Sequence, residues 1–466
     1  MKFLIVLSLL VANLFASDAD IKSAVVKIFT VSSKPSIRQP WTSIISRATG
    51  SGCIIEGNKI LTNAHVVTHQ TYLEVLKNGD TKKYEAEVLS VNHAGDLALI
   101  TVKDKSFFEG TKALKIGDLP SLQQKVDAYG FPEGGSTLSI TSGVISRIEH
   151  QVYAHSGAKL LAIQIDAAVN PGNSGGPAIS DGKVVGLVMQ GKRSSQNIGY
   201  IIPTNVIKHY LDDLKDNKLD GYPMLGVEIE TLENPSIKEM YKLKDKKVGV
   251  LINRVYPNSP AFKVLKSNDV LIEIDGKKVY SNAKVEFRDK EFTSFNYMLQ
   301  EHQVGDEVKI KILRDGKEKG YKIKVDKTFD DLNLIKVAKF KDKLTYYIYG
   351  GFVFVPASIE YRFADKYLDM FPTKNRDELV LAYRVLPSSL SRGFEKVRDM
   401  IVEKVNGKTP KNFKDFVKII ESGKSKFVVF EDDHNYKIVL KRSEVLKNRK
   451  SLLNKYNIKS YKSDEL

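Results

Sequence analysis

Short apolar runs separated by turn-forming residues fill the first 200 positions of the chain. They hold many Val, Ile, Leu and Tyr residues and are bounded by Gly, Asn, Asp or Ser, which is typical of β-strands. We expect strands at residues 24–31, 52–55, 59–61, 97–102, 125–129 and 183–189. Many short strands without intervening helices indicate a β-sandwich or barrel. Apolar residues at helical spacing then predict a helix over residues 206–214.

Two further units follow a polar linker at residues 216–222. In the second unit, residues 222–327, we expect strands at 225–229, 248–255, 270–274 and 307–313 and a helix near 292–301. In the third, residues 332–442, we expect strands at 344–354, 379–385, 426–431 and 436–440 and a helix near 413–421. Residues 269–278 and 399–408 resemble each other, which suggests one module used twice. The Lys-rich residues 443–466 form a basic tail or helix.

The two ends of the chain resemble targeting signals. Residues 1–16 combine a basic start, an apolar run and a small-residue exit, which predicts a signal peptide cleaved after Ala16. The apolar run is shorter than the ~20 residues that span a bilayer, so we expect a periplasmic or secreted mature protein, with an uncleaved anchor as the alternative. The final Ser-Asp-Glu-Leu is close to an ER-retrieval signal, which has meaning only in a eukaryotic lumen.

Composition excludes several classes of protein. A 42% hydrophobic and 27% charged content excludes general disorder, and 466 residues at ~150 per domain suggest three domains. One cysteine, Cys53, excludes an intrachain disulfide framework. The net charge of +16 is spread along the chain, so no nucleic-acid partner is expected. Because no nucleotide-binding or HExxH motif is present, we expect no metal and no other cofactor.

Three segments of the first unit carry candidate chemistry. They are Thr62-Asn63-Ala64-His65, Gly95-Asp96-Leu97 and Gly172-Asn173-Ser174-Gly175-Gly176. A serine hydroxyl is a weak nucleophile until a base takes its proton, and a histidine with a pKa near 6.5 is mostly neutral at pH 7. A carboxylate holds the imidazole tautomer, and backbone N–H groups beside the serine stabilise an oxyanion by about 3 kcal/mol per donor.

Each segment alone is more often an ordinary strand end, turn or loop. Together, in the order His, Asp, Ser within a β-rich unit, they favour catalysis, and this order is the one found in chymotrypsin-type barrels. His65 is then the base, Asp96 its orienting partner and Ser174 the nucleophile, with an oxyanion hole at the N–H groups of Gly172 and Ser174.

These segments resemble the HtrA/Deg (Do-like) family of serine proteases. The resemblance implies a mainly β fold, with a chymotrypsin-like double β-barrel at residues 21–215 followed by two PDZ-like α+β domains, the second divergent. It further implies a homo-oligomer, a trimer or a multiple of trimers. By resemblance, the specificity pocket is lined by Met189, Gln190, Gly191, Asn197, Ile198 and Gly199, and peptides bind the first PDZ domain at Met224, Leu225, Gly226, Val227, Phe295 and Leu299.

Four residues near the motifs do not follow this pattern. Cys53 stands where the family more often has an aromatic or aliphatic residue, and we expect it to be a small buried apolar side chain. His69 and His93 match nothing in the motifs and are expected at the surface, and His155 has no assigned role.

The resemblance implies an ATP-independent endopeptidase that degrades unfolded or damaged proteins outside the cytoplasm through an acyl-enzyme. Peptide C-termini or internal segments at the first PDZ domain would position substrate or regulate activity, and the preferred P1 side chain would be small or medium-sized and apolar. One alternative is a chaperone or scaffold that holds unfolded clients with little turnover. Another is a secreted factor that acts on host adhesion proteins and uses the same catalytic residues.

Overall fold

The chain folds into two compact units. The computed structural model describes residues 16–191, 198–216, 218–243, 248–362 and 365–466. The first unit contains the described residues up to 32 together with 46–255 and 260–328, and the second contains 33–45, 256–259 and 329–466. The signal peptide predicted at the N-terminus lies, apart from Ala16, outside the described residues. No helix in the described ranges is long and apolar enough to cross a membrane.

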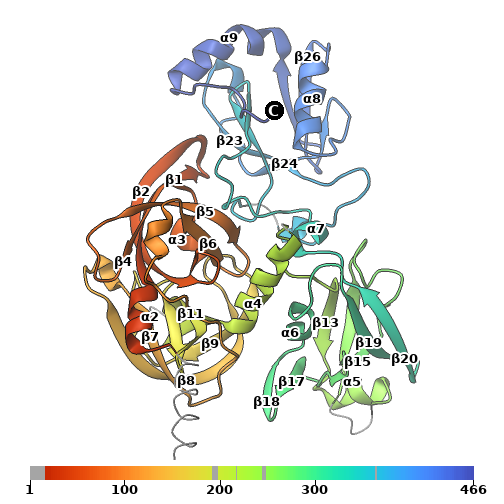
Figure 1. Ribbon diagram of the computed structural model, residues 1–466. Coiled ribbons are helices and arrows are strands. Elements are labelled where there is room, and N and C mark those ends of the chain that lie inside the picture. The colour runs from red at the N-terminus through yellow and green to blue at the C-terminus, as the bar shows by residue number, and fades with distance from the viewer. Residues whose placement is uncertain (1–15, 192–197, 217, 244–247, 363–364) are drawn as a thin grey trace, which may run out of the picture. The chain divides into compact units, whose positions relative to one another are not determined.

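Two closed antiparallel barrels form the N-terminal part of the first unit (Figure 1). The first barrel has the order β1–β2–β3–β6–β5–β4 and the second β10–β11–β12–β9–β8–β7. The strands of the first are β1 Val25–Ser36, β2 Gln39–Ile55, β3 Lys59–Thr62, β4 Gln70–Lys77, β5 Tyr84–Asn92 and β6 Leu97–Val102. Those of the second are β7 Lys125–Gly130, β8 Ser139–Val152, β9 Lys159–Ile165, β10 Pro177–Ser180, β11 Lys183–Gly191 and β12 Gly199–Pro203. The predicted strand 97–102 is confirmed, because its apolar run is buried inside the first barrel.

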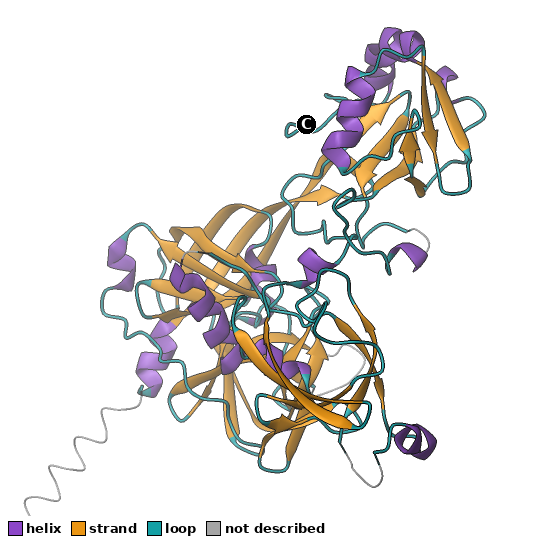
Figure 2. Ribbon diagram, turned by 90° about the vertical axis from the view of Figure 1, so that its right-hand side faces the viewer, coloured by secondary structure: helices purple, strands orange, loops and turns teal. Residues whose placement is uncertain are grey.

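Helices are few in this part of the chain, as the colouring by secondary structure makes clear (Figure 2). They are α2 Asp18–Ala24, α3 Ala64–Val67 and α4 Thr204–Asp213, with 3-10 turns η1 Lys105–Phe108, η2 Pro132–Gly134 and η3 Leu214–Asp216. The helix predicted at 206–214 is therefore confirmed as α4. Its apolar face buries Val206, Ile207 and Tyr210 in the hydrophobic core of the barrels.

The rest of the first unit is a sheet with the order β13–β14–β15–β19–β20. Its strands are β13 Val227–Thr231, β14 Val250–Val255, β15 Val270–Ile274, β19 Glu307–Arg314 and β20 Lys317–Lys324. The short strand β16 Lys277–Lys278 pairs with β15, and β17 Lys284–Arg288 and β18 Glu291–Ser294 form a separate hairpin. The helices are α5 Pro235–Met240 and α6 Asn296–Gln300. The helix predicted at 292–301 is wrong over its first residues. Phe292 and Thr293 alternate outward and inward in β18 and pair with β17, which leaves only α6 helical.

The second unit contains two sheets, β21–β22–β23–β24 and β25–β26–β27. The strands are β21 Tyr347–Tyr349, β22 Phe352–Pro356, β23 Val380–Val385, β24 Met400–Val402, β25 Lys404–Val405, β26 Phe427–Glu431 and β27 Lys437–Lys441. The helical elements are α7 Phe329–Leu332, α8 Phe413–Ser422, α9 Arg442–Lys455 and the 3-10 turns η4 Asp365–Tyr367 and η5 Ser389–Ser391. The single strand predicted at 344–354 is wrong, because Gly350 and Gly351, with φ of +61° and +94°, form the two-residue turn of a hairpin.

The C-terminal segment is part of this second unit. After α9, the Tyr461 carbonyl accepts a hydrogen bond of 2.7 Å from the Ile348 N–H, and the Ser463 N–H donates one of 3.1 Å to the Tyr346 carbonyl. The Lys462 ammonium lies 3.2 Å from the Glu421 carboxylate of α8. These contacts hold residues 461–463 along the outer edge of β21, so the Ser-Asp-Glu-Leu end begins at a buried serine, Ser463.

Candidate active site

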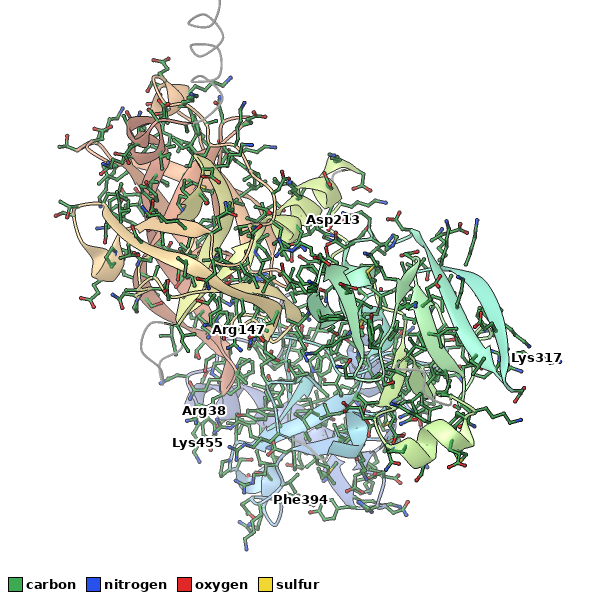
Figure 3. All side chains as sticks on the ribbon, turned by 90° about the horizontal axis from the view of Figure 1, so that it is seen from below. Arg38, Arg147, Asp213, Lys317, Phe394 and Lys455 are labelled. Atoms are coloured by element: carbon green, nitrogen blue, oxygen red, sulfur yellow. The ribbon has the colours of Figure 1, made fainter. Side chains whose placement is uncertain are left out.

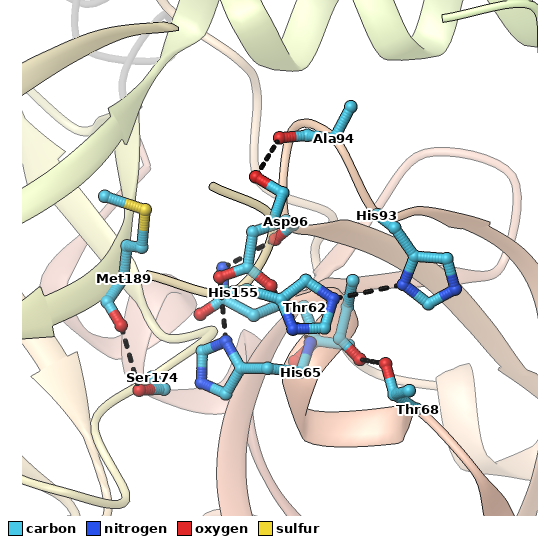
Figure 4. A network of polar contacts seen from close by, with 12 residues as sticks. Thr62, His65, Thr68, His93, Ala94, Asp96, His155, Ser174 and Met189 are labelled. Atoms are coloured by element: carbon cyan, nitrogen blue, oxygen red, sulfur yellow. Dashed lines mark hydrogen bonds and ion pairs between the residues drawn. The ribbon is translucent and has the colours of Figure 1, made fainter. Parts of the chain in front are cut away.

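His65 and Asp96 form a hydrogen-bonded pair at the end of the first barrel. The Nδ1 atom of His65, in α3, lies 2.8 Å from Oδ2 of Asp96, and the backbone N–H of His65 donates to Oδ1 at 2.9 Å (Figure 4). The Asn63 side-chain amide donates to the Asp96 carbonyl at 2.9 Å. Asp96 is only 1% exposed and precedes the buried strand β6. Oδ2 therefore contacts the imidazole and Oδ1 the backbone of the same residue, and the orienting role of Asp96 stays a prediction.

Ser174 lies in the loop before β10, and glycine makes this loop possible. A methyl group on Gly175, whose φ is +83°, would lie 2.2 Å from both the Ser51 carbonyl and the Thr62 hydroxyl. The Ser174 carbonyl accepts a hydrogen bond of 2.8 Å from the Ser51 N–H. The loop is therefore pinned to the first barrel, although it connects β9 and β10 of the second, and this brings Ser174 into the site of His65 (Figure 4).

The hydroxyl of Ser174 donates to the Met189 carbonyl at 3.2 Å, so His65 does not accept its proton in this state (Figure 4). Catalytic hydrogen bonds are often completed only when substrate binds, and a rotation about the Cα–Cβ bond redirects a serine hydroxyl. Across the site, Ser174 lies between the Met189 carbonyl and His65, and Asp96 lies on the other side of His65 (Figure 4). The arrangement brings the predicted nucleophile, base and orienting carboxylate together, with the Ser174 hydroxyl turned toward Met189.

The predicted oxyanion hole lies on the same loop. Gly172 has φ of +100°, and a methyl group there would lie 2.4 Å from the Phe131 carbonyl, so only glycine fits. In the described part of the chain, the N–H groups of Gly172 and Ser174 have no hydrogen-bond acceptor. They are thus available to a ligand oxygen, and their catalytic role stays a prediction.

The predicted specificity residues lie on β11 and β12, beside Ser174. Met189 is buried, and Gly191 pairs with Gly199 across the two strands. A methyl group on Gly199 would lie 2.7 Å from a methyl of Val169, so a larger residue would not fit at this position. Gln190 is described by its backbone alone, which pairs with Tyr200, and Ile198 is half-buried. Asn197 lies outside the described residues.

Two histidines with no predicted role lie beside the pair of His65 and Asp96. The rings of His65 and His155 have centroids 6.1 Å apart, and Nδ1 of His93 lies 3.0 Å from Nε2 of His155 (Figure 4). The turn between β8 and β9 carries His155 to the loop before β6, 62 residues away in the chain, so no local pattern could predict the contact. The surface position predicted for His69 is wrong, because its side chain is buried, and His93 is half-buried.

The predicted peptide-binding residues occupy the edge and the core of the sheet that contains β13. Gly226 has φ of +77° at the start of β13, and the Met224 N–H donates to the Lys327 carbonyl at 2.8 Å. Val227 is half-buried on β13. Leu225, Phe295 and Leu299 belong to the buried core of this domain. Their contribution to peptide binding stays a prediction.

Cys53 is fully buried in the core of the first barrel, as expected of a small apolar side chain. Burial raises the pKa of its thiol to about 12, so the thiol is chemically inert in the folded state. Within the described ranges, no group of three or more His, Cys, Asp or Glu side chains could hold a metal ion.

Comparisons with known proteins agree with this architecture. The trypsin-like peptidase domain family matches residues 50–187, and PDZ domain families match residues 223–325 and 335–465. The chain is 38% identical over 465 residues to Protease Do-like 2, chloroplastic, of Arabidopsis thaliana, which covers 96% of this chain and 76% of the relative. It is 39% identical over 420 residues to Protease Do-like 4, mitochondrial, of Arabidopsis thaliana. This alignment covers 88% of this chain and 79% of the relative.

The chain belongs to the Do-like (HtrA/Deg) family of serine proteases. A solved structure of the HtrA-type protease AlgW with a tripeptide shares the fold, with a TM-score of 0.52 and 23% identity over 66% of this chain and 96% of that one. As a Do-like protease the chain is a serine endopeptidase. The predicted fold class is confirmed as a mainly β protein, with a trypsin-like double barrel followed by two PDZ domains.

Proposed function

We propose that this Do-like protease cleaves unfolded or damaged proteins without ATP, with Ser174 as nucleophile, His65 as base and Asp96 as orienting carboxylate. The observation that carries the proposal is the buried Asp96 carboxylate, which receives both the Nδ1 and the backbone N–H of His65 at 2.8 and 2.9 Å. This contact keeps the Nε2 atom unprotonated and ready to accept a proton.

The reaction begins when the hydroxyl oxygen of Ser174 attacks the carbonyl carbon of the scissile peptide and its proton passes to Nε2 of His65. The developing oxyanion is stabilised by the N–H groups of Gly172 and Ser174. His65 then gives the proton to the leaving amine, and an ester on Ser174 remains. Water, deprotonated by His65, hydrolyses the ester and restores the free hydroxyl.

The proposed substrates are extended segments of unfolded chains. A small or medium-sized apolar P1 side chain is proposed, and the buried Met189 and the Val169 methyl near Gly199 support it. Two PDZ domains fit the binding of peptide segments, and capture of a C-terminus or an internal segment is proposed for the first of them. Assembly into trimers or multiples of trimers stays a prediction.

The proposed location is outside the cytoplasm or inside an organelle, with a role in protein quality control and stress response. It is supported by the signal peptide predicted for residues 1–16 and by the mitochondrial and chloroplastic names of the relatives. Detection of the tagged full chain in a membrane-bound compartment tests the location. N-terminal sequencing of the purified protein tests whether residues 1–16 are removed.

The experiment that tests the proposed activity compares the protein with Ser174→Ala on a casein-like unfolded substrate. Loss of cleavage in Ser174→Ala, with full cleavage by Ser142→Ala, is the expected result. Ser142 is an exposed serine of β8 whose hydroxyl donates to Asp127, so it controls for the loss of a serine hydroxyl. Cleavage by Ser174→Ala would overturn the catalytic assignment.

A chaperone with little turnover is the second candidate. The observation that favours it is the Ser174 hydroxyl, which donates to the Met189 carbonyl rather than to His65. If both the protein and Ser174→Ala fail to cleave casein but suppress aggregation of an unfolded client, this second function replaces the first.

A further inference from the structure

Tyr222, at the junction between α4 and the first PDZ domain, contacts the loop that carries Asp96. Its hydroxyl oxygen lies 2.9 Å from the position of a methyl group on Gly95, the residue directly before Asp96. The Tyr222 ring packs against the protease core. Because Gly95 has no side chain, the tyrosine reaches the backbone of the loop itself.

Tyr222 is held on its other side by α4. Its ring stacks on that of His209, with centroids 4.4 Å apart and an interplanar angle of 16°. The Asp213 carboxylate, at the C-terminal end of α4 (Figure 3), accepts hydrogen bonds from the N–H groups of Asp220 and Gly221 at 3.2 and 3.0 Å. Stacking and hydrogen bonds therefore fix the junction to the protease domain, so it is not a free linker.

The loop that Tyr222 contacts has an unusual backbone conformation. Asp96 has φ of +52°, a left-handed conformation that costs a non-glycine residue free energy. Its N–H donates to the His93 carbonyl at 3.2 Å, and the Gly95 N–H donates to the Asn92 side chain at 2.9 Å. A strained backbone conformation of this kind persists only where the surrounding residues hold it in place, and the contact with Tyr222 is one such restraint.

We propose that Tyr222 is a positioning residue for Asp96. By packing on Gly95, it keeps the Asp96 carboxylate where it holds the His65 ring. This inference rests on the catalytic roles proposed above for His65 and Asp96.

Gly95 provides a specific test of the contact. An added methyl meets only the Tyr222 hydroxyl at close range, since its next neighbours are Val206 at 3.5 Å and Asn92 at 3.6 Å, which are ordinary contacts. The hydroxyl itself is buried and has no hydrogen-bond partner among the described residues, so Tyr222→Phe removes it without breaking a bond. Gly95→Ala should therefore displace the loop, and Tyr222→Phe should relieve the displacement.

The expected result is a fall in kcat of about 10- to 100-fold for Gly95→Ala, with KM unchanged, because a displacement of about 1 Å at a catalytic group costs up to about 100-fold. The double variant Gly95→Ala/Tyr222→Phe should recover most of this loss, because the added methyl then occupies the place of the hydroxyl. Tyr222→Phe alone removes the contact with Gly95 and should lower kcat by a smaller factor.

A matched control is Gly320→Ala in β20, where an added methyl meets nothing within 4 Å. Circular dichroism confirms that each variant is folded. A Gly95→Ala variant with the parent's kcat, or a folded one that Tyr222→Phe fails to rescue, would overturn the role of Tyr222. If Ser174→Ala still cleaves substrate, the proposed catalytic function fails instead, whatever Gly95→Ala does.

Discussion

Replacing Asp96 with Asn tests the reaction chemistry at its most buried group. The two carboxylate oxygens accept hydrogen bonds from the backbone N–H and from Nδ1 of His65, at 2.9 and 2.8 Å. An asparagine has one oxygen, and the backbone N–H retains it because its position is set by α3. The new NH2 group then faces Nδ1, and two donors cannot form a hydrogen bond. The imidazole must move its proton to Nε2, where it blocks acceptance of the Ser174 proton.

The size of the effect follows from this change of tautomer. In triads of the chymotrypsin type, the same change lowers kcat about 10⁴-fold. At 1.36 kcal/mol per tenfold, this loss corresponds to about 5 kcal/mol of transition-state stabilisation. Asparagine has nearly the same shape as aspartate, so we expect the fold and KM to change little. The loss should appear almost entirely in kcat.

The assay follows initial rates of cleavage of a fluorescently labelled unfolded casein near pH 7, over a range of substrate concentrations. Asp118→Asn is the matched control, since the Asp118 side chain is 92% exposed and pairs with Lys208 at the surface. The control should keep the parent's rate. A folded Asp96→Asn variant within tenfold of the parent in kcat would refute the tautomer argument and with it the role of Asp96.

The remaining predictions concern two groups away from the nucleophile. Burial raises the pKa of Cys53 to about 12, so iodoacetamide should label this thiol only after the protein unfolds. Mass spectrometry would detect the label, and rapid labelling of the native protein would contradict the burial of Cys53. Desolvation lowers the pKa of His150, which contacts Thr293 and Gln300, to about 4. An unfolded histidine titrates near 6.5, so from pH 6.5 down to 4 only the unfolded state gains this proton and the free energy of unfolding should fall. His150→Gln should flatten this dependence in urea unfolding followed by circular dichroism, and an unchanged slope would show that other groups cause it.

Local patterns were sufficient to predict most of the regular elements. The buried run 97–102 and the strand 270–274 have the predicted bounds, because strands with apolar residues at most positions are recognisable from neighbouring residues alone. The two errors arose where pairing outweighed a local pattern. Phe292 and Thr293 entered β18 because β17 offered a partner strand, and Gly350-Gly351 folded one apolar run into a hairpin.

The site divides in the same way. The chemical types and their order, His65 then Asp96 then Ser174, were readable in the chain because each lies in a short motif with its own turn residues. That the three side chains lie close together could not be read from the chain, because His65 and Asp96 are 31 residues apart and Ser174 belongs to the second barrel. Pairing of β3 with β6 brings His65 near Asp96, and the hydrogen bond from Ser51 to the Ser174 carbonyl joins the second barrel to the first.

The sequence by itself determined the family, the domain order and which residues are candidates for catalysis, because these depend on residue types at short spacing. Only the tertiary structure decided which way the Ser174 hydroxyl turns, that His93 and His155 lie beside His65, and that Tyr222 packs on Gly95. Each of these is a contact between residues remote in the chain, and no short-range pattern encodes it. Long-range packing alone sets such contacts, through close approach at a few positions such as Gly95 and Gly175.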